Sequence, residues 1–370
     1  MPAGTGPAAT PPWTTGPRRR RAPDGQTGRV FAPRRASLIA FLVAAMAVAP
    51  VLAADPRGGA GSPPPTPPGS LPTAPPRGVP PSRATAPTLP GAPACPVFPT
   101  TNVWNQRIDG RPVAANSATL ITTIGRTRGL HMDFGSYAGY GIPYQIVTGS
   151  TPRSTVTFQY ASESDRVGYP IPASPLIEGE PGATTGDRHI LMVDRDVCRL
   201  YELFAASKVN GAWRAGSGAT WNLRSNALRT AGWTSADAAG LPILPGIVRY
   251  DEVAAGAIRH ALRFTTNRTR TSYIYPARHQ AGESSSSSLP PMGLRVRLKA
   301  SYDTRGLSPH ARVIAEALKR YGMILADNGS PWYITGTSDP RFDDDVLHEL
   351  DAITGNDLEV VDTTGLVNGP

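Results

Sequence analysis

The fold class is decided by residues 189–204, which read His189-Ile190-Leu191-Met192-Val193-Asp194-Arg195-Asp196-Val197-Cys198-Arg199-Leu200-Tyr201-Glu202-Leu203-Phe204. Two apolar runs, His189–Val193 and Val197–Phe204, flank the polar triplet Asp194-Arg195-Asp196. Apolar runs of this length are typical of strands, and a short polar segment between two of them predicts a hairpin turn. We therefore expect an antiparallel pair of strands in the middle of the domain.

Similar apolar runs recur on both sides of this hairpin. They are Ile142–Val147, Thr155–Tyr160, Ala261–Thr265, Ser272–Tyr275 and Leu294–Ala300. In the last run, residues 294–299 alternate between apolar and basic side chains. This period of two predicts a strand with one buried and one exposed face.

Helices are expected mainly near the C-terminus. Residues Pro309–Ala326 place apolar side chains on one face, after the N-cap Ser308 and before Asn328-Gly329. The other predicted helical segments are Asp345–Ile353, Ser117–Ile124 and Ser235–Ala239. The expected fold class is α+β and β-rich. It would have an antiparallel β-sandwich or a twisted sheet core with a C-terminal helix pair, preceded by a disordered N-terminal region.

The N-terminal part has the composition of an export segment. An arginine-rich stretch precedes the apolar run Ser37–Ala54, and small residues follow. This order is typical of a secretory signal peptide, although the run is also near the length of a membrane anchor. Residues 1–54 are therefore expected to be a cleaved signal or an anchor. Contact with a membrane is expected only through this segment.

Residues 55–94 are about one third proline, which predicts an extended, disordered tether. Residues 95–370 are expected to form a single globular domain. The net charge of +9 divides into +6 for residues 1–54, +2 for residues 55–94 and +1 for the rest. A nucleic-acid-binding face needs clustered basic residues in the folded part, so we expect no nucleic-acid partner.

Cys95 and Cys198 are the only cysteines of the chain. In an exported protein such a pair predicts a disulfide. The bond would close a loop of about 100 residues and contribute up to about 4–5 kcal/mol of stability in the chain-entropy model.

Three histidine segments are the main candidates for chemistry. They contain His131 with Asp133, Asp187 with His189, and Arg278 with His279. A histidine beside a carboxylate can transfer protons, with the carboxylate fixing the tautomer. Three imidazoles could equally hold one divalent metal ion, so the expected cofactor is either none or one such metal bound by His131, His189 and His279.

Further candidates come from one carboxylate and several aromatic residues. Glu178 lies in a Gly- and Pro-rich loop shortly before Asp187 and could form one half of a glycosidase carboxyl pair. Tyr140, Tyr144, Trp221 and Trp233 are candidate sugar-stacking residues. The chain contains no Walker A, HExxH, GxSxG or CxxC motif, which disfavours nucleotide, zincin and ordinary serine-hydrolase functions.

Several longer segments resemble a group of exported proteins from high-GC, actinobacteria-like bacteria. These are the blocks 221–229 and 232–246, Tyr250-Asp251-Glu252-Val253, and Tyr321-Gly322-Met323-Ile324-Leu325-Ala326-Asp327-Asn328-Gly329-Ser330, together with the three histidine segments. The resemblance covers about residues 100–365, and Met132 replaces the proline that the pattern leads us to expect. The resemblance implies export, and it does not indicate which activity the protein has.

The leading hypothesis is an extracellular polysaccharide-active enzyme, a hydrolase or a lyase. It would use His189 or His279 as the acid–base residue, with Asp187 and Asp133 as partners. The expected partner is a polysaccharide or cell-wall glycan. Two alternatives remain open: a non-catalytic glycan-binding module on a Pro-rich stalk, and a metal-dependent hydrolase acting on another class of substrate.

Overall fold

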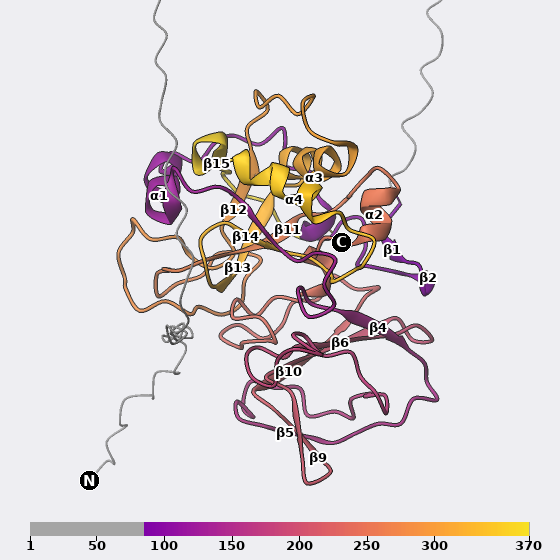
Figure 1. Ribbon diagram of the computed structural model, residues 1–370. Coiled ribbons are helices and arrows are strands. Elements are labelled where there is room, and N and C mark those ends of the chain that lie inside the picture. Colours follow the sequence, from indigo (N-terminus) through magenta and orange to yellow (C-terminus); the bar gives the residue numbers. More distant parts are fainter. Residues whose placement is uncertain (1–84, 370) are drawn as a thin grey trace, which may run out of the picture. The chain divides into compact units, whose positions relative to one another are not determined.

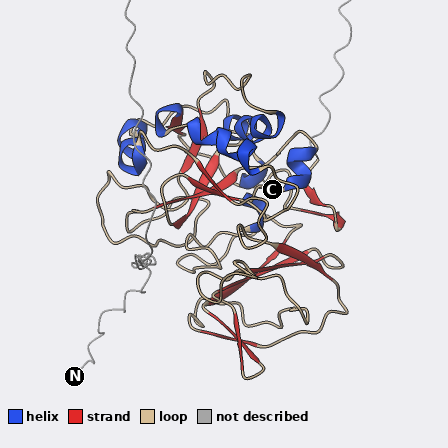
Figure 2. Cartoon of the chain, in the orientation of Figure 1, coloured by secondary structure: helices blue, strands red, loops and turns tan. Residues whose placement is uncertain are grey.

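The computed structural model describes residues 85–369, which are rich in strands and contain few helices (Figure 1, Figure 2). This confirms a β-rich α+β fold. The predicted export segment, residues 1–54, lies outside the described residues, and so does the tether up to residue 84. The last part of the expected tether belongs to the described fold, because β1 (Thr88–Leu89) and β2 (Ala92–Pro96) pair with each other.

The largest sheet has six strands and carries most of the C-terminal half. Its strands, in order across the sheet, are β15 (Leu358–Val360), β12 (Arg295–Leu298), β13 (Met323–Asn328), β11 (Leu262–Thr266), β14 (Tyr333–Thr335) and β3 (His131–Asp133). The pairs β11 with β13 and β14 with β3 are parallel, so the sheet is mixed rather than antiparallel. The α-helices are α1 (Ser117–Gly125), α2 (Tyr250–Ala254), α3 (Pro309–Arg320) and α4 (Asp344–His348).

Two smaller sheets form from the middle of the described residues. One has the order β10 (Ser217–Asn222), β7 (Arg199–Phe204), β6 (Ile190–Asp194) and β4 (Tyr144–Val147). The other has the order β5 (Val156–Phe158), β9 (Ala212–Ala215) and β8 (Ser207–Val209). Single 3₁₀ turns occur at η1 (Val103–Asn105), η2 (Leu244–Gly246), η3 (Glu349–Ala352) and η4 (Gly355–Asp357).

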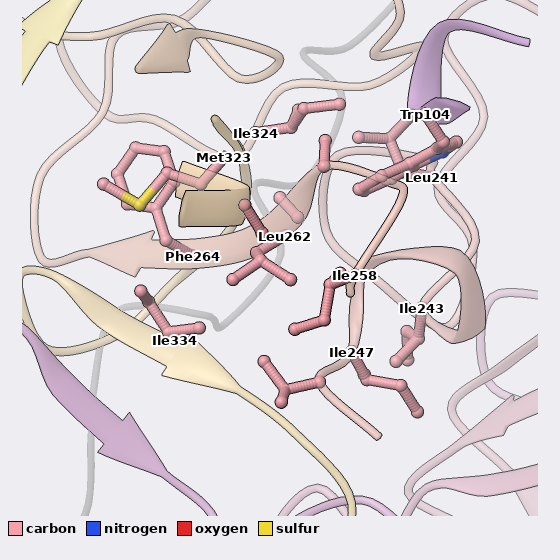
Figure 3. Close-up of a cluster of buried hydrophobic side chains, with 14 of the residues drawn as sticks. Trp104, Leu241, Ile243, Ile247, Ile258, Leu262, Phe264, Met323, Ile324 and Ile334 are labelled. Carbon is pink, nitrogen blue, oxygen red and sulfur yellow. The ribbon is translucent and has the colours of Figure 1, made fainter. Parts of the chain in front are cut away.

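The hairpin predicted from residues 189–204 is present as β6 and β7, which pair antiparallel. Alternate residues of β6 enter two different hydrophobic cores: Leu191 and Val193 join the large core, and Ile190 and Met192 join a smaller one. Figure 3 shows part of the large core around Leu262 and Phe264. Burial on both faces explains why this segment is continuously apolar.

The predicted disulfide between Cys95 and Cys198 is confirmed, with the two Cα atoms 5.2 Å apart. It links β2 to the turn between β6 and β7. The residues that enter the domain are thus covalently fixed to the central hairpin.

The helix predicted over Pro309–Ala326 is wrong in its last third, because α3 ends at Arg320 and β13 begins at Met323. Gly322 separates them with a φ of +64°, a conformation that favours glycine. A Cβ at Gly322 would lie 2.3 Å from the carbonyl oxygen of Val296. The following residues are apolar because β13 is a central strand, and this gives them the same composition as a buried helix face.

The prediction that residues 294–299 form a half-exposed strand is also wrong. Both basic residues of β12 are buried, with Arg295 only 1% exposed. The Arg295 guanidinium donates to the carbonyls of Val103, Gln106 and Tyr321. Arg297 donates to three carbonyls of residues 108–111 and to Glu359. Hydrogen bonds with distant backbone make this burial possible.

Two further predicted elements differ from the structure. Ser272–Tyr275 is not a strand and makes only an isolated bridge from Tyr273 to Met292. Ser235–Ala239 is a series of turns rather than a helix, because the Ser235 hydroxyl bonds to the carbonyls of Asp237 and Leu241. Among the helices of residues 85–369, none combines the length and apolar character needed to cross a bilayer.

Candidate functional site

A polar cleft of about 390 Å³ lies at one edge of the six-stranded sheet and is closed by loops that precede β4 and β6. Strands β3, β11, β13 and β14 supply part of its lining. The residues with ionisable or aromatic side chains are Asp133, Tyr140, Glu178, Asp187, His189, Arg263, Asp327 and Tyr333. Four carboxyl groups therefore face one small space.

Gly141 fits the loop that closes the cleft because of its conformation. Its φ is +115°, and a Cβ there would lie 2.7 Å from the backbone nitrogen of Ser338. A side chain would strain the backbone and push residues 139–142 away from the sheet.

Arg263 on β11 holds the acidic groups at the base of the cleft. It makes two hydrogen bonds with the buried Asp237, from Nε at 3.1 Å and from Nη2 at 2.8 Å. Its Nη1 donates to the Thr335 hydroxyl at 2.6 Å. Asp327 lies farther away, with its Oδ2 at 3.8 Å from Nη2. The guanidinium thus stabilises the Asp237 carboxylate strongly and the Asp327 carboxylate only weakly.

The pKa of Asp327 is raised well above its usual range. Burial is the main cause, followed by the negative charge of Asp237, and the charge of Asp187 adds to it. The positive charge of Arg263 opposes the shift without cancelling it. Two carboxylates beside one guanidinium cannot both be stabilised in the ionised form, so Asp327 keeps its proton more readily than a free aspartate.

Asp133 on β3 is a second carboxyl group with a raised pKa. Burial raises it, and the nearby His131 opposes the shift. Asp133 lies opposite Thr335 in the parallel register of β3 and β14. The strand pairing therefore brings a residue of the early histidine segment to the same edge as the Arg263 network.

Glu178 and His189 form a buried ion pair in the opposite wall. The Glu178 Oε2 accepts from Nδ1 of His189 at 2.6 Å and from its backbone nitrogen at 3.2 Å. Burial disfavours the charged imidazole, but the Glu178 carboxylate outweighs it and raises the pKa of His189 to about 10. Burial likewise opposes ionisation of Glu178, yet the charge of His189 lowers the pKa of this carboxyl.

The second nitrogen of the His189 ring is also occupied. Its Nε2 lies 2.9 Å from the carbonyl oxygen of Ala236. Both partners of the ring are hydrogen-bond acceptors. The protonated imidazolium donates from both nitrogens and therefore satisfies the Glu178 carboxylate and the Ala236 carbonyl together. The geometry gives His189 the role of holding Glu178 ionised, and the Oε1 atom of Glu178 makes no hydrogen bond with the described residues.

His131 stands behind the cleft rather than in its lining. Its ring packs against Tyr333 with centroids 4.1 Å apart, and its Nε2 lies 2.7 Å from the Tyr140 hydroxyl. Burial, followed by the charge of Asp133, raises the pKa of Tyr140, which therefore remains a neutral phenol. His131 thus helps to hold Tyr140, which lines the cleft.

The structure brings several predicted site residues together and leaves others apart. Asp133, Tyr140, Glu178, Asp187 and His189 line one cleft. The remaining predicted residues, which are absent from the lining, are His131, Tyr144, Trp221, Trp233, Arg278 and His279.

The side chains of Arg278 and His279 both bond to backbone carbonyls. The Arg278 Nε donates to the carbonyl of Arg229 at 2.9 Å, and His279 Nδ1 lies 2.8 Å from the carbonyl oxygen of Ala238. Both side chains thereby support the turns of residues 229–240.

The described residues contain no group of three His, Cys, Asp or Glu side chains that could hold a metal ion. His131, His189 and His279 each bond to a different partner: Tyr140, Glu178 and the Ala238 carbonyl. The geometry does not support a metal site built from these three histidines.

Sequence reasoning missed Asp237, Arg263 and Asp327. Asp327 was not recognised as a candidate because the apolar run before it predicted a helix. Arg263 was not recognised because it lies within an apolar strand. One signal was available: a charged residue inside an otherwise apolar strand needs a buried partner. No family model, no curated protein and no solved structure matches this chain.

Proposed function

We propose that residues 85–369 form a hydrolase that cleaves glycosidic bonds of an extracellular polysaccharide, with Asp327 as the proton donor and Glu178 as the ionised carboxylate. The observation that carries this proposal is that two carboxyl groups of one cleft have opposite protonation tendencies. The pKa of Asp327 is raised and the pKa of Glu178 is lowered. Glycoside hydrolysis needs one carboxylic acid and one carboxylate on either side of the scissile bond.

Each group has a defined part in the reaction. The proton of Asp327 goes to the glycosidic oxygen as the bond from that oxygen to the anomeric carbon breaks. A water molecule adds its oxygen to the anomeric carbon, and its proton goes to the free Oε1 of Glu178. One water is consumed, and both products end in hydroxyl groups. His189 stays protonated and keeps Glu178 ionised until that proton arrives, and the proton then returns to Asp327 through solvent.

Asp133 is the second candidate for the proton donor, since burial also raises its pKa. We assign the role to Asp327 because two neighbouring carboxylates add to its burial, whereas Asp133 lies beside His131. The experiment below therefore includes both residues.

Hydrolysis is favoured over β-elimination by the charges of the cleft. A lyase that acts on uronic acids needs a cation to neutralise the sugar carboxylate. The two cations in the described lining, Arg263 and His189, are already paired with Asp237 and Glu178. Because neither cation is left to neutralise a sugar carboxylate, a neutral or amino sugar suits the cleft better than an anionic one.

A larger groove of about 680 Å³ adjoins the cleft and could hold neighbouring sugar units. Residues 138–144 contribute to the walls of both spaces, and so do residues 177–181. Tyr144 and Tyr250 line the groove. Tyr137, which is 58% exposed, lies in the loop that precedes β4. Aromatic side chains beside a catalytic cleft are suited to packing against sugar rings.

We place this activity outside the cytoplasm, as the export signal predicts. The Cys95–Cys198 disulfide supports an oxidising compartment.

The test is product release by the full chain from a panel of neutral, amino and uronic acid polysaccharides. Reducing ends report hydrolysis, and unsaturated ends report elimination. We expect reducing ends only, with a loss of about 10²–10⁴-fold in Asp327→Asn and Glu178→Gln. Asp133→Asn should keep most of the activity, and Asp303→Asn is a matched control because this aspartate is exposed and lies in neither space.

Unsaturated ends would replace the hydrolase by a lyase, and loss only in Asp133→Asn would move the proton donor. Glycan retention without product release would favour the non-catalytic module.

A further inference from the structure

Two predicted sugar-stacking residues, Trp221 and Trp233, lie at a different place on the molecule. Two adjoining hollows of about 490 and 230 Å³ share Asp165, Thr220 and Trp233 in their lining. We call them together the Trp233 hollow. It has no lining residue in common with the cleft or with the larger groove.

The Trp233 hollow is built around a buried arginine between two tryptophans. The Arg229 guanidinium carbon lies 5.8 Å from the ring centre of Trp221 and 5.7 Å from that of Trp233. Its Nη1 donates to Asp165 at 3.0 Å, and its Nη2 donates to the carbonyl of Glu163 at 2.7 Å. These contacts fix the Trp233 ring from its inner side.

The burial of Arg229 costs stability, because its hydrogen bonds do not satisfy the whole guanidinium. Arg229 is only 8% exposed, and its Nε is buried without a hydrogen-bond partner among the described residues. An unsatisfied buried donor costs stability, and such groups are expected where a site constrains the fold.

The surface of the hollow offers free groups of the kinds that bind sugars. Trp233 is half-buried, and its indole N–H makes no hydrogen bond with the described residues. Asp165 uses Oδ2 for its three contacts, with Arg229 and both donors of Thr220, and leaves Oδ1 free. Asn222 accepts from the backbone through Oδ1 and leaves its amide NH₂ free.

We propose that the Trp233 hollow is a second glycan-binding site, separate from the cleft, in which a pyranose ring packs on Trp233. Ring hydroxyls would bond to the Asp165 carboxylate and the Asn222 amide, and Leu228, which is 40% exposed, would cover an apolar edge. An aromatic platform with a carboxylate and an amide fits an alternating pattern of sugar C–H and O–H groups. The site holds a polysaccharide near the domain and does not depend on the chemistry of the cleft.

The test is retention of the full chain by insoluble cellulose, chitin, xylan and purified peptidoglycan. We expect wild-type protein to bind at least one of them, and Trp233→Ala to weaken that binding by about tenfold. Asn222→Ala should weaken the binding as well. This second variant keeps the proposal testable if Trp233→Ala, which removes the ring that packs on Arg229, does not fold. Val209→Ala is the control, because this residue of β8 is exposed and lies outside the hollow.

A kinetic readout separates this proposal from the proposed hydrolase. On short soluble oligosaccharides Trp233→Ala should turn over like wild type, whereas Asp327→Asn should lose turnover and keep retention. Failure of every polysaccharide to retain the wild-type chain would overturn the second site. Unchanged retention in folded Trp233→Ala and Asn222→Ala would overturn it equally, whatever the cleft does.

Discussion

The Oε2 atom of Glu178 lies 2.6 Å from Nδ1 of His189. This contact makes a predicted acid–base histidine a cation at neutral pH, and its charge keeps a neighbouring carboxylate ionised. The acid–base work of the proposed hydrolase then falls to the two carboxyl groups Glu178 and Asp327, and the pH behaviour of the fold should reveal that assignment.

The first prediction concerns stability at alkaline pH. The folded-state pKa of His189 is raised to about 10, above its ordinary value of 6.5. Its contribution is fully present below pH 6.5 and is lost as pH rises through about 10. The unfolding free energy of wild type, measured by denaturant titration, should therefore fall across this window. His189→Gln should be less stable at neutral pH and lack that part of the fall, whereas His348→Gln, at an exposed ring, should keep it.

The second prediction is that Asp327→Asn gains stability while it loses activity. The raised pKa of Asp327 means that its ionisation destabilises the folded protein as pH rises above the ordinary value of 3.8. An amide cannot ionise, so the variant should melt at a higher temperature than wild type at neutral pH. Thermal unfolding at neutral and acidic pH checks this, because the difference should shrink on acidification. A lower melting temperature at both pH values would contradict the raised pKa.

The third prediction concerns the disulfide. Cys198→Ser should lower the unfolding free energy by up to about 4–5 kcal/mol, because a loop of about 100 residues is released in the unfolded state. Cys95→Ser should have a similar effect, and the double variant should add little to either. Denaturant titration of the three variants measures this, and additive losses would show that the thiols act separately.

The fourth prediction is that Gly141→Ala distorts the cleft wall. Its φ of +115° and the 2.7 Å approach to Ser338 predict a loss of about 1–3 kcal/mol in the unfolding free energy. Turnover should also fall under conditions where the variant remains folded, since Gly141 lines the cleft. Gly110→Ala is the matched control, because no atom lies within 4 Å of the added Cβ. Equal effects of the two substitutions would argue against a strained wall.

The sequence predicted what depends on local pattern and missed what depends on distant partners. The hairpin around Asp194-Arg195-Asp196, the start of α3 and the disulfide all follow from neighbouring residues. By contrast, the apolar run of β13 has the composition of both a helix face and a central strand, and its pairing with β11 and β12 decides between them. Arg295 is buried because backbone carbonyls near residue 105 meet it, and no local signal predicts those contacts.

The same distinction applies to the site. Asp133, Glu178, Asp187 and His189 were predicted as candidates because acids and histidines stand out in loops. Their convergence on one cleft depends on the parallel pairing of β3 with β14, and that pairing was not predicted. Asp327 was missed as a candidate, since its special property is a charge balance with Asp237 and Arg263 that exists only in the folded protein.

The disulfide has a mechanical consequence when the domain is pulled from its N-terminal side. Tension applied there would act first on the pairing of β1 with β2 and on Leu89, which is buried in the large core. The pull would then stop at Cys95 and pass through a covalent bond to Cys198 in the turn between β6 and β7. Extension of the described chain would be limited to the residues before Cys95, and the load would then pass to the central hairpin for as long as the bond stays oxidised.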